Sequence, residues 1–300
     1  MSAITWPEAA VVGAMQGIAE LFPVSSLGHS VLLPALVGGR WARDLSVSNA
    51  ESPYLAFIVG LHVATAVALV VFFWRDWIRI VKGAISVLRY RRAETPDERL
   101  ALLLVLATIP VGITGLLLEH TFRTVLSKPV PTALFLMLNG ILLLGAEQLR
   151  RKSGGPDHLP EDERTSGVAS DARIAKMPIA RGVLIGAAQI AALAPGISRS
   201  GVTMAAGLLR GLSHEDAARF SFLLATPVIA AAGVLKIGDL TGPLGAGVRG
   251  QVIFGSLLSG VGAFLALKFL TRFFRSGNLR PFGIYCLIAA SASLLTFGIR

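Results

Sequence analysis

The chain has 300 residues, of which 53% are hydrophobic and only 15% are charged, a composition that excludes an ordinary soluble domain and indicates a membrane protein. Its 28 Lys and Arg residues exceed its 18 Asp and Glu residues, a formal net charge of +10 that would suggest a nucleic-acid partner in a soluble protein. Here the cations lie between apolar stretches and form no basic face, so we interpret them as topology signals and expect no nucleic-acid partner.

The first apolar region covers residues 4–37 and is interrupted in its middle by the polar string FPVSSLGHS. No cation precedes Arg40, whereas a signal peptide needs a basic start, so we expect this region to remain in the protein. A break of this kind within a hydrophobic stretch is typical of two half-helices in a re-entrant hairpin. The next three segments, 53–74, 100–118 and 131–149, are each long and apolar enough to span a bilayer core of about 30 Å.

Residues 150–176 are hydrophilic, and we predict a solvated linker without a separate function there. A second apolar region, 178–211, is broken by the string APGISRSGVT and predicts another re-entrant hairpin. Three further spans are predicted at 215–236, 249–272 and 280–299, the last of which contains the single cysteine, Cys286. One cysteine excludes an internal disulfide and a CxxC metal cluster, and we interpret it as a small packed residue.

The cations test this arrangement. If residues 75–99 are cytoplasmic, twenty of the Lys and Arg residues fall on the cytoplasmic side, seven fall on the other side, and Arg199 is left at membrane depth. This asymmetry agrees with the positive-inside rule and requires the two hairpins to enter from opposite sides. We therefore predict an all-α polytopic protein in which halves 1–149 and 178–300 form an inverted-topology repeat, joined by a cytoplasmic linker over 150–177.

The first break carries one group of polar residues. Gln16 and Glu20 lie four residues apart and share a face of the first half-helix, and Ser25, Ser26 and His29 follow in the break. Ionisable side chains within apolar segments are costly, so each is a candidate for function. The alternative is that Glu20 only neutralises a buried cation and that the serines only cap the second half-helix.

The second break carries the cation. Arg199 suits a phosphate ligand because its planar guanidinium can donate two parallel hydrogen bonds to the oxygens. Ser198, Ser200 and Thr203 add hydroxyls, and Gly201 allows close backbone approach, at a half-helix N-terminus that favours an anion.

Together the two breaks offer a carboxylate, an imidazole, hydroxyls, a guanidinium and backbone amides, a set that suits phosphoryl transfer. Their depth in the membrane predicts a substrate with a phosphate head and a lipid tail. In the structural alternative, Arg199 and Glu20 pair only to stabilise the fold, which would still bring both breaks together. A rival function is transport, a flippase for a polyprenyl phosphate lipid, because secondary transporters also use inverted repeats with broken helices.

The strings QGIAELFPVSSLGHS and PGISRSGVT resemble the two signature motifs of the undecaprenyl-diphosphate phosphatase (bacitracin-resistance) family, and the likeness extends over essentially the whole chain. The resemblance implies a multi-pass enzyme of the bacterial inner membrane that hydrolyses undecaprenyl diphosphate to undecaprenyl phosphate and inorganic phosphate. This activity would recycle the lipid carrier for cell-wall synthesis and confer bacitracin resistance. The implied site opens to the periplasmic side and needs a divalent cation, Mg²⁺ or Ca²⁺, bound by Glu20; a homodimer is left open.

Residue by residue, the resemblance implies catalytic roles for Glu20, Ser26, His29 and Arg199, and substrate-binding roles for Gln16, Ser25, Ser198, Ser200, Gly201 and Thr203. The sequence departs from the family pattern at Gln16, where many members have a carboxylate, and at His62, where many have Gln. We expect His62 to be a hydrogen-bonded core histidine, with a polar neighbour of the site as the alternative. The nucleophile is left open among Ser26, His29 and water, with Ser26 favoured because a hydroxyl just after a helix break can face the cavity.

Overall fold

The computed structural model describes residues 4–45, 53–121, 126–152, 167–236 and 247–299, together with 238 and 242. These residues form helices and connecting turns, with no strand among them. The helices are α1 (Trp6–Leu21), α2 (Ser26–Val37), α3 (Gly39–Asp44), α4 (Pro53–Phe72), α5 (Trp74–Tyr90), α6 (Pro96–Thr121), α7 (Pro129–Lys152), α8 (Gly167–Ala175), α9 (Ile179–Ala187), the 3-10 helix η3 (Ala188–Leu193), α10 (Arg199–Leu209), α11 (His214–Leu235), α14 (Arg249–Phe273) and α15 (Arg280–Ile299).

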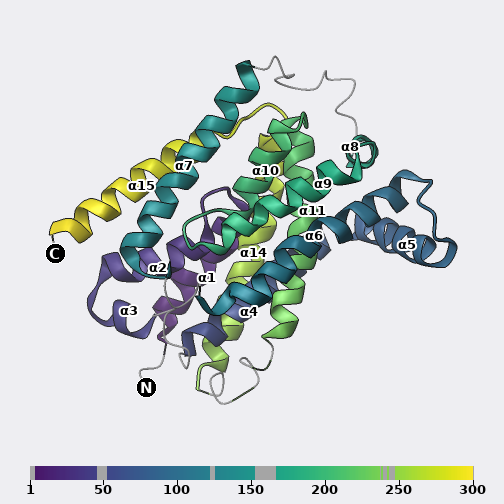
Figure 1. The fold of residues 1–300 in the computed structure, drawn as a ribbon. Coiled ribbons are helices and arrows are strands. Elements are labelled where there is room, and N and C mark those ends of the chain that lie inside the picture. Colours follow the sequence, from purple (N-terminus) through teal and green to yellow (C-terminus); the bar gives the residue numbers. More distant parts are fainter. Residues whose placement is uncertain are drawn as a thin grey trace.

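Six of these helices are long and apolar enough to cross a membrane: α4, α6, α7, α11, α14 and α15. They coincide with the six predicted spans, so the prediction of an all-α polytopic protein is confirmed. Figure 1 shows α7 and α15 side by side along one edge of the bundle, with α14 near its centre. Helices α1, α2, α9 and α10 are shorter and lie among the spans.

The first broken hairpin consists of α1 and α2. Helix α1 starts with a capping box, in which the Thr5 side chain accepts a hydrogen bond from the Glu8 amide and the Glu8 carboxylate accepts one from the Thr5 amide. It ends at Leu21, because Pro23 disfavours a helical conformation in the residue before it. Helix α2 then begins at Ser26 with Ser25 as its N-cap.

The second broken hairpin consists of α9 with η3, followed by α10. The chain passes through Pro195 and Gly196, whose φ of 109° lies in a region that L side chains rarely adopt, and α10 begins with Ser198 as its N-cap. Both predicted breaks are therefore present as helix, break and helix. That the hairpins re-enter a membrane from opposite sides stays a prediction, as does the division into two inverted halves.

Glycines allow each broken hairpin to pack closely against a spanning helix of the other half of the chain. They are Gly13 and Gly17 in α1, which face α14, and Gly182 and Gly186 in α9, which face α6. A Cβ atom at Gly17 would overlap the Ser259 carbonyl group, and one at Gly186 would overlap the Ala107 carbonyl group. In both places two small residues four apart bring the helix backbones together, as is typical of membrane helix pairs.

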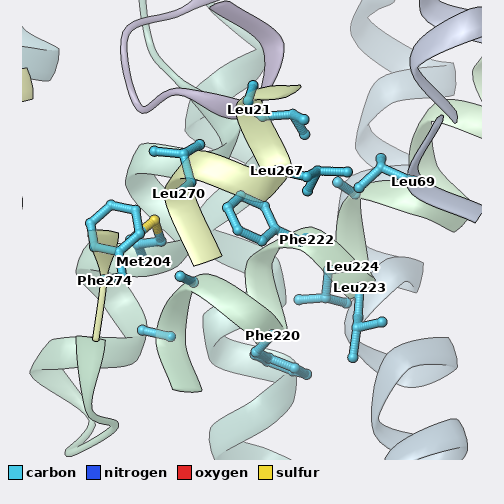
Figure 2. Packing of buried hydrophobic residues seen from close by; sticks show 14 of the residues in the cluster. Leu21, Leu69, Met204, Phe220, Phe222, Leu223, Leu224, Leu267, Leu270 and Phe274 are labelled. Atoms are coloured by element: carbon cyan, nitrogen blue, oxygen red, sulfur yellow. The ribbon is translucent and has the colours of Figure 1, made fainter. Parts of the chain in front are cut away.

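The largest apolar core lies beside the first break. Figure 2 shows Phe222 of α11 beside Leu267 and Leu270 of α14, with Leu21 at the end of α1 nearby. These side chains are buried, and Phe220 extends the cluster along α11. The core therefore fixes the end of α1 against two spanning helices.

The linker prediction needs a correction. Residues 153–166 lie outside the described residues, but 167–175 form helix α8, which packs against α6 and α11. Asp171 of α8 is buried and binds Arg219 at 2.7 and 2.8 Å and Arg79 at 2.8 Å. The prediction of a solvated loop is therefore wrong for α8, because its carboxylate pairs with arginines of two other helices.

Candidate active site

The two helix breaks meet at the carboxylate of Glu20, in the last turn of α1. Its Oε1 binds Nη2 of Arg199, the first residue of α10. Its Oε2 accepts hydrogen bonds from the Ser26 hydroxyl and, at 3.0 Å, from Nε2 of Gln16. The Glu20 side chain is only 6% exposed and that of Arg199 is 17% exposed, so this is a mostly buried ion pair between residues 179 positions apart.

His62 of α4 lies beside the same carboxylate. Its Nδ1 donates to the Ile58 carbonyl oxygen at 2.9 Å, and its Nε2 lies 3.3 Å from Gln16 Nε2 and 3.4 Å from Glu20 Oε2. With the proton on Nδ1, Nε2 is the acceptor for the Gln16 amide. The structure therefore places His62 beside the site as the polar neighbour, which was the alternative to the core histidine that the sequence favoured.

The N-terminus of α2 arranges the other residues of the first motif. Ser25 has a φ of 69°, and its Oγ accepts a hydrogen bond from the Gly28 amide at 3.2 Å. His29 donates from Nδ1 to the Ser25 carbonyl oxygen at 2.7 Å, and its Nε2 lies 2.7 Å from the Tyr285 hydroxyl, with the two rings stacked. Both nitrogens of His29 are thus bound to groups other than Ser26, whose hydroxyl faces Glu20.

The second motif supplied the predicted phosphate ligands Ser198, Ser200, Gly201 and Thr203. In the structure the Ser198 hydroxyl accepts from the Gly201 amide at 3.1 Å, and the Ser200 hydroxyl donates to the Phe22 carbonyl oxygen at 3.2 Å. The Thr203 hydroxyl donates to the Arg199 carbonyl oxygen at 2.8 Å. These contacts cap α10 and fasten it to the first break, so the hydroxyls hold the helix turn that carries Arg199.

Asn139 of α7 joins the two breaks directly. Its Oδ1 accepts from the Ser198 amide at 2.9 Å, and its Nδ2 donates to the Pro23 carbonyl oxygen at 3.1 Å and contacts Cys286 Sγ at 3.3 Å. The side chain is completely buried. Sequence reasoning missed both Asn139 and Tyr285, although a lone amide within an apolar span is a usable signal, because an unpaired one would be costly.

The half-helices α2 and α10 both start at this site. Gly28 and Gly196 touch closely, since a Cβ atom at Gly28 would lie 3.0 Å from the Gly196 Cα atom. The first backbone amides of a helix have no partner within the helix, and its N-terminus carries a partial positive charge. Two such ends beside Arg199 make a region that favours an anion such as a phosphate.

The residues of this site supply only part of a metal coordination shell. Glu20 is the one carboxylate, and both of its oxygens already accept from Arg199, Ser26 and Gln16. Gln16 Oε1 is buried without a hydrogen-bond partner and is a second available oxygen. Mg²⁺ and Ca²⁺ take six or more oxygen ligands, so most ligands of such an ion would have to come from a substrate and water. Across the described residues, no group of three or more His, Cys, Asp or Glu side chains could hold a metal.

Comparisons with known proteins point to one family. The model of the family described as "Bacitracin resistance protein BacA" matches residues 9–292. A protein of Mycolicibacterium paratuberculosis named "Undecaprenyl-diphosphatase" is 64% identical over 99% of both chains. "Undecaprenyl-diphosphatase 1" of Frankia casuarinae is 48% identical over the full length of both, and the "Undecaprenyl-diphosphatase" of Gluconobacter oxydans is 42% identical over 95% of this chain and 96% of its own.

Proposed function

The chain belongs to the family of bacitracin resistance proteins and undecaprenyl-diphosphatases, a family of membrane enzymes, and from this premise we propose that its active site lies where the two broken hairpins meet. The substrate is undecaprenyl diphosphate and the products are undecaprenyl phosphate and inorganic phosphate. One observation carries this assignment. Glu20 accepts a hydrogen bond from the Ser26 hydroxyl and binds the Arg199 guanidinium. One carboxylate, suited to act as a base, therefore contacts both a nucleophile and a cation.

In the resting enzyme Arg199 neutralises Glu20. When the diphosphate binds, the Arg199 guanidinium moves from Glu20 to the oxygens of the terminal phosphate, which match its planar donors. Glu20 is then released to act as a base toward Ser26. The first-turn amides of α2 and α10 add donors for the phosphate oxygens.

The reaction proceeds in two displacements. Ser26 Oγ attacks the terminal phosphorus while Glu20 takes its proton, and the bond between that phosphorus and the bridging oxygen breaks. The bridging oxygen leaves with undecaprenyl phosphate. Water then attacks the phosphorus of the phosphoserine, the bond between that phosphorus and Ser26 Oγ breaks, and Glu20 returns its proton to Oγ. Inorganic phosphate is released with the oxygen and the protons of the water. Arg199 stabilises the negative charge that develops on the transferred phosphoryl group in both steps.

The other predicted residues have supporting roles in this scheme. Gln16 donates to the Glu20 carboxylate and to His62, and the hydroxyls of Ser198, Ser200 and Thr203 hold α10. His29, which is bound to the Tyr285 hydroxyl, would contact the phosphate of the leaving undecaprenyl phosphate. A divalent cation, Mg²⁺ or Ca²⁺, would neutralise phosphate charge, with Glu20 and Gln16 Oε1 as its protein ligands.

The lipid tail would lie in the bilayer among the spanning helices while the head group reaches the breaks. The multi-pass fold supports this arrangement. In a bacterium the site would face the periplasm from the inner membrane, recycle the lipid carrier for cell-wall synthesis and thereby protect against bacitracin.

The test is phosphate release from undecaprenyl diphosphate by the purified protein in detergent, where no second compartment exists for transport. We expect wild type to release phosphate, EDTA to abolish the release, and Arg199→Ala and Ser26→Ala to be inactive. A radiolabelled terminal phosphate should be trapped on Ser26 after rapid acid quenching. Label on another residue, or full activity of Ser26→Ala, would overturn the assignment of Ser26 as the nucleophile. No phosphate release by wild type would favour a flippase.

A further inference from the structure

Helix α5 has an apolar face that no other part of the described structure covers. Trp74, Ile78, Val81, Ile85 and Leu88 recur at intervals of four and three residues, which places them in one stripe along the helix. All five are exposed, Ile85 to 59% and Leu88 to 80%. This stripe is separate from the face that packs on the protein, where Ile80 and Gly83 are buried.

A cationic stripe runs beside the apolar one. Arg75, Lys82 and Arg89 are spaced seven residues apart, so they lie on one line of the helix and all three are exposed. The one carboxylate of α5, Asp76, is turned toward Arg79 and Arg219 at 2.6 and 3.0 Å. The exposed surface of α5 is therefore apolar and positive, without a negative side chain.

The position of α5 places these stripes at the boundary of the bilayer. The helix begins two residues after the spanning helix α4 ends. Its inner face packs on the first turn of the spanning helix α6, where Arg79 binds Asp97 at 2.9 Å and the Ser86 hydroxyl binds Glu98 at 2.6 Å. Figure 1 shows α5 extending from the side of the bundle next to the start of α6. It thus lies where two spans leave the membrane, on the side that the cations predict to be cytoplasmic.

We infer that α5 is an interfacial helix whose apolar stripe (Trp74, Ile78, Val81, Ile85 and Leu88) enters the cytoplasmic leaflet while its cationic stripe (Arg75, Lys82 and Arg89) binds anionic lipid head groups. An amphipathic helix with large apolar residues on one face and cations beside them is suited to the boundary between head groups and acyl chains. The long stems of Lys and Arg can lie along the apolar surface while their charges reach the phosphates. A second copy of the chain fits less well, because an antiparallel two-fold pairing of α5 through its apolar stripe would bring the cationic stripes together.

Nitroxide labels on the full-length protein in lipid nanodiscs can test this placement. Ile85→Cys reports on the apolar stripe, Glu94→Cys is an exposed control in the following turn, and Leu117→Cys on α6 is a lipid-facing control. Cys286 is buried, and wild type treated with the same reagent corrects for its labelling. We expect the label at position 85 to be accessible to oxygen and protected from a water-soluble nickel complex, at a depth of roughly 5–10 Å.

Lipid composition tests the cationic stripe. In nanodiscs with phosphatidylglycerol the label at position 85 should lie deeper than in phosphatidylcholine alone, and Arg75→Gln with Lys82→Gln and Arg89→Gln should remove this difference. Phosphate release in detergent should stay at the wild-type level in every variant, which checks that the fold is intact.

Three results would overturn the inference. A label at position 85 as exposed to nickel as the one at 94 would place α5 in water. Equal depth in both lipids would show that the cations bind no anionic head groups. Spin–spin broadening that disappears on dilution with unlabelled protein would show that a second copy covers the stripe.

Discussion

The guanidinium of Arg199 binds the carboxylate of Glu20, although the two residues come from opposite halves of the chain and from two different broken hairpins. Each is the counter-ion that the other needs at membrane depth. A buried ion pair is costly to form, and its loss leaves one charge without a partner. In the proposed mechanism the same pair must open for Arg199 to reach a phosphate, so the proposal predicts that stability and activity depend on it in different ways.

Removal of one charge should therefore destabilise the protein more than removal of both. We expect Arg199→Ala to lower the free energy of unfolding by about 3–5 kcal/mol because Glu20 stays buried without its cation. Glu20→Gln combined with Arg199→Gln should regain most of that stability while phosphate release stays at least about 100-fold below wild type. Thermal unfolding in detergent and phosphate release measure the two effects. A double variant as unstable as Arg199→Ala would contradict this.

Asn139 should act as a positioning residue for the two breaks. Asn139→Leu removes the bonds to the Pro23 carbonyl and the Ser198 amide, and each group left unsatisfied costs about 1–3 kcal/mol. A shift of Glu20 relative to Arg199 of about 1 Å should lower kcat about 100-fold, with KM much less affected. Cys286→Ser, which keeps an acceptor near Asn139 Nδ2, serves as the control and should resemble wild type.

A double-mutant cycle distinguishes positioning from general damage. If Asn139 acts through Glu20 and Arg199, Asn139→Leu should reduce activity much less in a Glu20→Gln background than in wild type. Fully additive losses would mean that Asn139 has only a structural role.

The backbone of Ser25 predicts opposite effects for two small substitutions. Its φ of 69° is unfavourable for a residue with a Cβ atom, and its hydroxyl caps α2 through the Gly28 amide. Ser25→Gly relieves the backbone and loses only a few tenths of a kcal/mol as a cap, so we expect a gain of about 0.5–1 kcal/mol. Ser25→Ala keeps the strain and loses the cap, at about 1 kcal/mol. Equal unfolding temperatures for the two variants would argue against this account.

Close approach of α1 and α14 should be sensitive to a single methyl group. The Cβ atom in Gly17→Ala would overlap the Ser259 carbonyl group, so we expect a loss of about 1–3 kcal/mol and lower activity, because Glu20 follows within one turn. Gly145 in α7 is the matched control, since nothing lies within 4 Å of its Cβ position. Gly145→Ala should be neutral or stabilising by about 0.5–1 kcal/mol. Thermal unfolding of both variants checks the contrast.

The sequence allowed the spans, the two breaks and the meeting of the breaks to be predicted, because the length of apolar segments and the cost of buried charge are local properties. The Glu20–Arg199 pair was considered only as the structural alternative. It did not identify Asn139 or Tyr285, since their importance depends on which carbonyl, amide or imidazole lies opposite them on another helix. The substrate-binding roles of Ser198 and Thr203 stay predictions; the sequence did not predict that their hydroxyls bind the backbone of α10. Helices α5 and α8 were not predicted. The cations of α5 were interpreted only as topology signals, and α8 was interpreted as part of a loop.

Because the chain is synthesised from its N-terminus, Glu20 is made before its partner Arg199. Ribosomes add about 5–20 residues per second, so the 179 residues between these partners take about 10–35 s to appear. Helix α14, against which α1 packs, emerges later still. A nascent α1 therefore carries Glu20 before either Arg199 or α14 has been made. Synthesis of this enzyme thus includes an interval in which Glu20 has been made and its counter-ion has not.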